Sequence, residues 1–231
     1  FIFICMLAAV LGSCTTSSST PESGHRLPDW ALGGFERPEG VNPVISPRTD
    51  TKFYCPMRKD SVAWESNDTF NPAATIYNGD IVVLYRAEDK SGVKIGHRTS
   101  RIGYATSTDG VHFQREESPV FYPAEDAQKE LEWPGGCEDP RVAVTENGLY
   151  VMLYTQWNRE RPRLAVATSR NLKEWTKHGP VFGKAFGGKF FNLECKSGSI
   201  LTEVVNGKQV IKRMNGKYFM YWGEHHVYAA T

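Results

Sequence analysis

Residues 78–89 read NGDIVVLYRAED, and two later stretches repeat the pattern: NGLYVMLYTQWN at 147–158 and NGKYFMYWGEHH at 215–226. Their starting points lie 69 and 68 residues apart. Each stretch opens with Asn-Gly, which favours a tight β-hairpin turn. Each then continues in a β-branched or aromatic run that is typical of a strand. The spacing predicts a strand-built unit that recurs along the chain.

A second set of segments repeats in phase with the first: IGYATSTDGVHF from 102, LAVATSRNLKEW from 164 and VYAAT from 227. A unit of somewhat over 60 residues that contains only strands indicates a β-propeller blade. No strong amphipathic helix pattern is present, and residues 171–175 suggest at most one helical turn. We therefore expect an all-β fold in which residues 29–231 form about three blades of a propeller. Because propellers usually have about four to eight blades, we expect this chain to be a fragment of a longer one.

Composition limits the classes of partner. The 231 residues include 27 Lys and Arg against 26 Asp and Glu, whereas nucleic-acid binding needs a basic excess. Aromatic residues make up 12% of the chain. Trp and Tyr combine an apolar face with a polar tip, which suits an oligosaccharide partner. For any single aromatic residue, however, ordinary β-core packing is the favoured explanation.

The N-terminus has the features of an exported lipoprotein. Residues 1–11 are apolar but too few to cross a bilayer as a helix, so we assign 1–13 to a signal peptide. The sequence LGSC at 11–14 fits a bacterial lipobox with Cys14 as the lipidated residue, and 14–28 resemble a flexible tether. The expected location is the bacterial cell envelope, with membrane contact only through the lipid anchor. The alternative is a simple cleavable signal in which the cysteine occurs by chance.

The remaining cysteines do not suggest a disulfide or a metal site. Cys55, Cys137 and Cys195 are widely spaced, and the chain has no C-x-x-C pair. We expect three buried free thiols. We also expect no metal and no cofactor, because His225 and His226 are adjacent rather than at ligand spacing.

The stretch GGCEDPRV at 135–142 is the strongest candidate for chemistry. Pro140 fixes its own φ and restricts Asp139, so the carboxylate is held rigidly where a strand begins. In the repeat, Pro140 aligns with Pro72 of FNPAATIYNG, which places Asn71 where Asp139 stands one blade later. Equivalent positions in adjacent blades point to one axial site for a hydroxylated ligand. Alternatively, both residues only cap turns, as Asn and Asp often do.

The segments FNPAA, YRAED, GCEDPRV, ATS, LKEW and GPVF together resemble glycoside hydrolase family 130, over about residues 70–231. That family contains β-mannoside phosphorylases and β-mannosidases on a five-bladed β-propeller. The resemblance implies that Asp139 is the general acid and that Asn71 and Arg86 contact sugar. Glu138 could raise the pKa of the acid, although adjacent strand residues point to opposite faces. Arg141 would share the face of Asp139.

Two nucleophiles are compatible with the resemblance. Inorganic phosphate as co-substrate would need a cationic pocket, for which the candidates are Arg141, Arg163, Lys196 and His225 or His226. Ser197 departs from the Asn that often follows this lysine in the family. Water would need a second carboxylate as base, for which Glu224 is the best candidate and Glu194 another. Export favours hydrolysis, and the basic residues favour phosphorolysis. A different class, a non-catalytic glycan-binding lipoprotein on the same fold, would not need Asp139.

Overall fold

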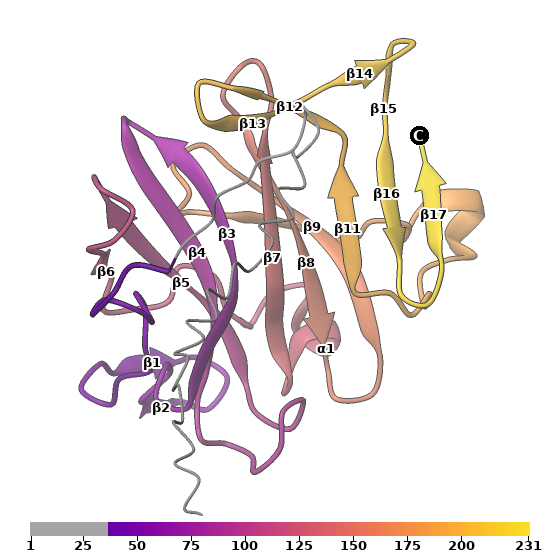
Figure 1. Ribbon diagram of the computed structural model, residues 1–231. Coiled ribbons are helices and arrows are strands. Elements are labelled where there is room, and N and C mark those ends of the chain that lie inside the picture. The colour runs from indigo at the N-terminus through magenta and orange to yellow at the C-terminus, as the bar shows by residue number, and fades with distance from the viewer. Residues whose placement is uncertain (1–36) are drawn as a thin grey trace, which may run out of the picture. The chain divides into compact units, whose positions relative to one another are not determined.

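The structure, a computed structural model, describes residues 37–231 and is almost entirely β (Figure 1). The predicted signal peptide, the predicted tether and Cys14 therefore lie outside the described residues. Within the described part the helices are α1 (Lys129–Glu132) and a 3-10 segment (Ala185–Gly188). Residues 171–175 form no helix, and no sequence pattern indicated α1.

The first two blades are antiparallel, consecutive and similar. The first contains β3 (Asp68–Tyr77), β4 (Asp80–Glu88), β5 (Ser100–Ser107) and β6 (Gln114–Arg115). The second contains β7 (Gly136–Val144), β8 (Tyr150–Trp157), β9 (Pro162–Ser169) and β10 (Thr176–Pro180). This arrangement confirms the prediction of an all-β chain with a repeated blade.

The third unit contains an insertion. Its sheet is formed by β11 (Ser197–Ile200), β16 (Met220–Gly223) and β17 (Val227–Ala230). Between β11 and β16 lie two hairpins, β12 (Thr202–Val205) with β13 (Lys208–Ile211) and β14 (Arg213–Met214) with β15 (Lys217–Tyr218). A further small hairpin, β1 (Phe53–Cys55) with β2 (Asp60–Val62), precedes the first blade.

The Asn-Gly pairs predicted a tight hairpin turn correctly at two of their three positions. Asn78 and Gly79 have φ of 52° and 94°, and Asn215 and Gly216 have φ of 50° and 77°, as tight hairpin turns of the primed type require. In the second blade the connection between β7 and β8 is longer, and only Gly148 has a positive φ there. The third Asn-Gly closes the inserted β14–β15 hairpin rather than the blade's inner hairpin.

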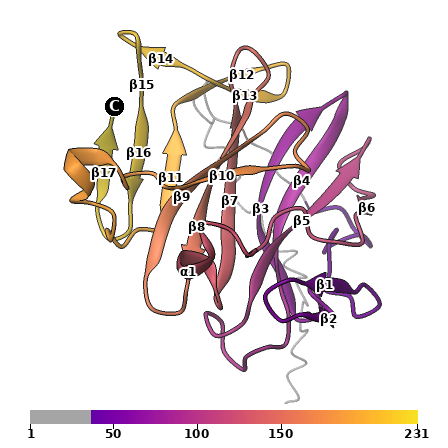
Figure 2. The same ribbon diagram turned by 180° about the vertical axis from the view of Figure 1, so that it is seen from behind.

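The core consists of layers between neighbouring blades. Leu84 and Tyr104 of the first blade pack in one cluster with Met152 and Tyr154 of the second. Leu153 lies on the opposite face of β8 and packs towards the third unit, because successive residues of a strand point to opposite faces. Burying each large apolar side chain contributes about 1.5–3 kcal/mol. Strand β3 lies beside β7, and seen from behind α1 packs near β8 (Figure 2).

Candidate active site

Two matching β-bulges place the candidate acid. Strand β3 is irregular between Phe70 and Ala73, and β7 between Glu138 and Arg141. The bulged residue Asn71 has φ of 44°, and its counterpart Asp139 has φ of 52°. A left-handed conformation at a non-glycine residue costs roughly 1–2 kcal/mol, and a bulge redirects the side chain that it carries. The predicted equivalence of Asn71 and Asp139 is therefore confirmed at the level of the backbone.

The carboxylate of Asp139 is held through one of its oxygens. Asn71 Nδ2 donates to Asp139 Oδ1 over 2.8 Å, and Arg86 Nη1 donates to the same oxygen over 3.0 Å. The side chain of Asp139 is 17% exposed. Among the described residues Oδ2 has no hydrogen-bond partner, so it is the oxygen that a ligand can reach.

Arg86 is the centre of the cluster and is 3% exposed. Its Nη2 donates to Glu88 over 2.6 Å and to Glu138 over 2.7 Å, and its Nε donates to the Ser100 hydroxyl over 3.1 Å. Burial alone would lower the pKa of this guanidinium, but Glu138, Asp139 and Glu88 raise it. Arg86 thus remains charged and compensates three carboxylates in a buried environment.

The side chains of Glu138 and Asp139 do not point to opposite faces of the strand, although a regular strand pattern predicts that they should. Both carboxylates contact Arg86, because the bulge and the positive φ of Asp139 interrupt the alternation of β7. Burial raises the pKa of Glu138, and the Asp139 charge adds to this, while Arg86 and Lys196 act in the opposite direction. Glu138 is therefore the nearby carboxylate that was expected beside the candidate acid Asp139.

Lys196 connects this cluster to Glu224. The Lys196 Nζ lies 3.4 Å from Glu138 Oε2. The backbone N–H of Lys196 donates to the Glu224 carboxylate over 3.3 Å. Glu224 itself is exposed, just beyond the end of β16. Lys196 thus links Glu138, through its side chain, to Glu224, through its backbone.

The remaining predicted cations have other positions. Arg163 is buried, donates to Asn192 over 2.7 Å and has its guanidinium 6.0 Å from the centre of the Phe191 ring. Burial, and then Arg161, lower its pKa. The alternative of a solvated strand charge is therefore wrong for Arg163, yet no hydrogen bond or ion pair of the described residues joins it to Asp139. His225 is exposed.

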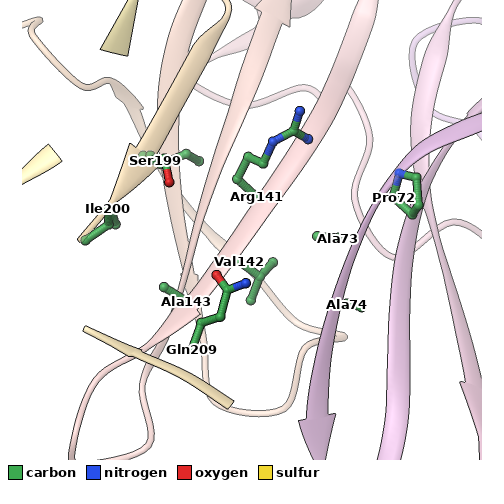
Figure 3. A pocket seen from close by; sticks show the side chains of 10 residues that line it. Pro72, Ala73, Ala74, Arg141, Val142, Ala143, Ser199, Ile200 and Gln209 are labelled. Carbon is green, nitrogen blue, oxygen red and sulfur yellow. The ribbon is translucent and has the colours of Figure 1, made fainter. Parts of the chain in front are cut away.

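Arg141 is an exposed residue of β7. Its Nη1 donates to the neighbouring Pro140 carbonyl over 3.0 Å, and no described ion pair joins it to Asp139. The side chain lines a cavity of about 170 Å³ together with Pro72, Ser199 and Gln209 (Figure 3). The expectation that Arg141 shares the face of Asp139 stays a prediction, because no described contact joins the two side chains and a bulge interrupts β7 between Glu138 and Arg141.

Sequence reasoning missed Glu88 and Ser100, although both contact Arg86 directly. The signal for Glu88 was available, since residues two apart on a strand share a face and YRAED places Glu88 two positions after Arg86. Within residues 37–231 no cluster of His, Cys, Asp and Glu could hold a metal ion, and no helix is long and apolar enough to cross a membrane. The three predicted free thiols, Cys55, Cys137 and Cys195, are buried.

Comparisons with known proteins show the family to which the chain belongs. A family model described as beta-1,4-mannooligosaccharide phosphorylase, of glycoside hydrolase family 130, matches residues 39–231. The 1,2-beta-oligomannan phosphorylase of Thermoanaerobacter sp. (strain X514) is 36% identical over 159 residues, which cover 67% of this chain and 49% of that protein. The beta-1,2-mannobiose phosphorylase of the same organism is 33% identical over 159 residues, or 64% of this chain and 47% of that protein. The chain spans about half the length of the curated relatives it matches.

Solved structures agree with the family model. One, from work on glycoside hydrolases of family 130 that target beta-1,2 mannosidic linkages in Candida mannan, is 79% identical with a TM-score of 0.85. It is matched over 88% of this chain and 56% of its own. A glycosyl hydrolase from Bacteroides ovatus is 83% identical with a TM-score of 0.85, over 88% of this chain and 57% of its own.

Proposed function

The chain belongs to glycoside hydrolase family 130, and from this premise we propose that it cleaves β-mannosidic linkages with Asp139 as the general acid. The observation that carries the proposal is the geometry of Asp139. One carboxylate oxygen is fixed by Asn71 and Arg86, and the other is open to a ligand. Such an arrangement fixes the acid in one orientation relative to a bound glycosidic oxygen.

The proposed reaction is a single displacement with inversion. Asp139 gives its proton to the departing glycosidic oxygen while the bond from that oxygen to the anomeric carbon breaks. Water attacks the anomeric carbon from the opposite face and loses a proton to Glu224. The products are two sugars with free reducing ends, and both carboxylates regain their starting protonation states by exchange with solvent. Inverting enzymes keep their two carboxyl groups roughly 6.5–9.5 Å apart to leave room for the water.

Hydrolysis is favoured over phosphorolysis by the contacts of the cations. Phosphate would need free guanidinium or ammonium groups beside the anomeric carbon. Lys196 instead faces Glu138, and Arg163 is bound to Asn192. The solved structures at 79% and 83% identity are also described as glycoside hydrolases. We therefore propose a β-1,2-mannosidic linkage as the substrate bond and water as the nucleophile.

Phosphorolysis is the second candidate, because the family model and both curated relatives carry phosphorylase names. In this reaction inorganic phosphate replaces water and releases a sugar 1-phosphate. Arg141 would be the available cation, since its only described partner is a neighbouring backbone carbonyl.

The test is an analysis of products from β-1,2- and β-1,4-mannobiose, with and without inorganic phosphate. Free mannose at a phosphate-independent rate is expected, with the α-anomer appearing first in proton NMR spectra. Mannose 1-phosphate that forms only with phosphate would establish the second candidate. Binding without turnover of either disaccharide would leave a non-catalytic glycan-binding protein.

We also propose that the protein is exported and lipidated at Cys14, on the basis of the LGSC sequence at 11–14. Metabolic labelling with radioactive palmitate in a bacterial host should mark the wild-type protein. The Cys14→Ser variant should be unlabelled and released from the membrane fraction. Equal release of both proteins would support a simple cleavable signal instead.

A further inference from the structure

The loop between β4 and β5 is bound to the acid cluster through a single arginine. Arg98 donates from Nε to the Gly92 carbonyl over 3.3 Å and from Nη2 to the Val93 carbonyl over 2.9 Å. The same side chain pairs through Nη1 with Asp68 and with Glu88, the latter over 3.2 Å. One guanidinium thus holds the turn of the loop and the end of β4 together.

Glu88 joins this guanidinium to the one that holds the acid. Its Oε1 accepts from Arg86 over 2.6 Å and from the Ser100 hydroxyl over 3.1 Å, and its Oε2 accepts from Arg98. Glu88 is fully buried. A buried carboxylate between two guanidinium groups links their positions, because moving either group leaves a charge poorly compensated.

The loop also contacts the second blade beside the strand that carries Asp139. The Trp157 indole N–H donates to the Gly96 carbonyl over 2.7 Å. Just after the loop, the Ser100 backbone N–H donates to the Gly135 carbonyl over 2.8 Å, immediately before β7. Val93 is 91% exposed at the loop tip. The loop is therefore fixed to both blades next to the candidate acid.

We infer that Glu88 and Arg98 are positioning residues of the reaction, which set the charge around Arg86 and hold the loop 89–99 against the site. This inference rests on the proposed function, because it assigns these residues to the acid Asp139. Neither residue touches the substrate in this scheme. They act through Arg86, whose Nη1 holds Asp139.

The sign of each electrostatic effect follows from the charges. A general acid works only while protonated, so activity falls as the pH rises through its apparent pKa. Removing the negative charge of Glu88 leaves the positive charge of Arg86 less compensated and so favours ionised carboxylates nearby. The alkaline limb of the pH–rate profile, where activity falls as the acid loses its proton, therefore moves to lower pH. Removing the positive charge of Arg98 has the opposite effect and moves the limb to higher pH.

The experiment is a pH–rate profile of kcat/KM on β-mannobiose for Glu88→Gln, Arg98→Ala and Arg98→Lys. We expect the alkaline limb to move down by about half a pH unit to one unit for Glu88→Gln and up by a similar amount for Arg98→Ala. Arg98→Lys keeps the charge, so its limb should not move. A lysine cannot reproduce the forked contacts to Gly92 and Val93, so hydrogen exchange of residues 90–97 should quicken. Val93→Ser is the matched control, with neither change expected.

Opposite limb shifts support the inference. Shifts in the same direction, or losses of kcat/KM with an unmoved limb in both charge variants, would overturn it and leave a structural role. If the wild-type protein turns over no β-mannoside, the proposed function fails separately. The charge coupling is then read from the carbon-13 NMR titration of the Asp139 carboxyl, which must move in opposite directions in Glu88→Gln and Arg98→Ala.

Discussion

The amide Nδ2 of Asn71 donates to Oδ1 of Asp139 over 2.8 Å, although the two residues are 68 positions apart in the chain. They meet because each is the bulged residue of its blade's inner strand, in β3 and in β7. One repeat of the motif supplies the candidate acid, and the preceding repeat supplies a neutral donor that orients it. The site is thus a product of the repeat rather than of either blade alone.

Replacing the acid should reduce turnover without removing binding. Asp139→Asn cannot donate a proton to the leaving oxygen, and we expect kcat/KM on β-mannobiose to fall by about 10²–10⁴-fold. In an aryl β-mannoside with an acidic phenol, the phenolate can leave without protonation. The fall in kcat/KM on that substrate should therefore be much smaller. Steady-state kinetics on both substrates provide the measurement. Equal losses on the two substrates would argue against Asp139 as the acid.

A second carboxylate beside Asp139 should change the pH dependence in a defined direction. Asn71→Asp exchanges a hydrogen-bond donor at 2.8 Å for a like charge, which favours the protonated acid. The alkaline limb of kcat/KM should therefore move to higher pH. Asn147→Asp, in the exposed turn of the second blade, is the matched control and should not move the limb. A limb that responds equally to both variants would reflect overall charge instead of contact.

The fold could be predicted from sequence because its signals are local. Asn-Gly turns and β-branched runs determine hairpins between residues that are close in the chain, and their recurrence indicated blades. The insertion of two hairpins in the third unit was missed, although Asn206-Gly207 carries the same turn signal, with φ of 51° and 75°. That signal lay outside the repeat, and only tertiary contacts show that β13 pairs with β7.

The site was predictable only in part. The repeat alignment was sufficient to pair Asn71 with Asp139, because both bulges precede a proline. It could not show that Glu138 turns to the same side, since the rule of alternating faces holds only for regular strands. The partners Ser100 and Lys196 come from other strands and loops, and their contacts arise from tertiary packing with no sequence period to indicate them.

Removing Arg86 should destabilise the protein more at high pH than at low pH. Arg86→Gln leaves the carboxylates of Glu88, Glu138 and Asp139 without their shared cation, and breaking such a buried cluster costs about 3–5 kcal/mol. Their mutual repulsion would raise folded-state pKa values above the unfolded ones. Stability is then retained below the unfolded pKa values and lost as the pH rises through the folded ones. Urea unfolding at pH 5 and pH 8 tests this, and a loss that is independent of pH would contradict it.

A second buried ion pair, which does not include the residues of the acid cluster, gives a separate test of the electrostatics. Glu132 is fully buried and pairs with Lys177 over 2.5 Å, while Tyr154 donates to its other oxygen over 2.8 Å. Burial raises the pKa of Glu132, and Lys177 opposes that rise. Lys177→Met removes the positive charge that opposes this rise, so the folded-state pKa of Glu132 should rise further.

We expect Lys177→Met to lower the free energy of unfolding by about 3–5 kcal/mol at pH 8, because it leaves a buried charge uncompensated. The loss should shrink as the pH falls below the raised pKa of Glu132, where the carboxyl is protonated. Adding Glu132→Gln should recover much of the loss, since the amide still accepts from Tyr154. Lys129→Met breaks only the exposed pair with Glu125 and should leave the urea midpoint unchanged. A double variant no more stable than Lys177→Met would show that packing, and not charge, causes the loss.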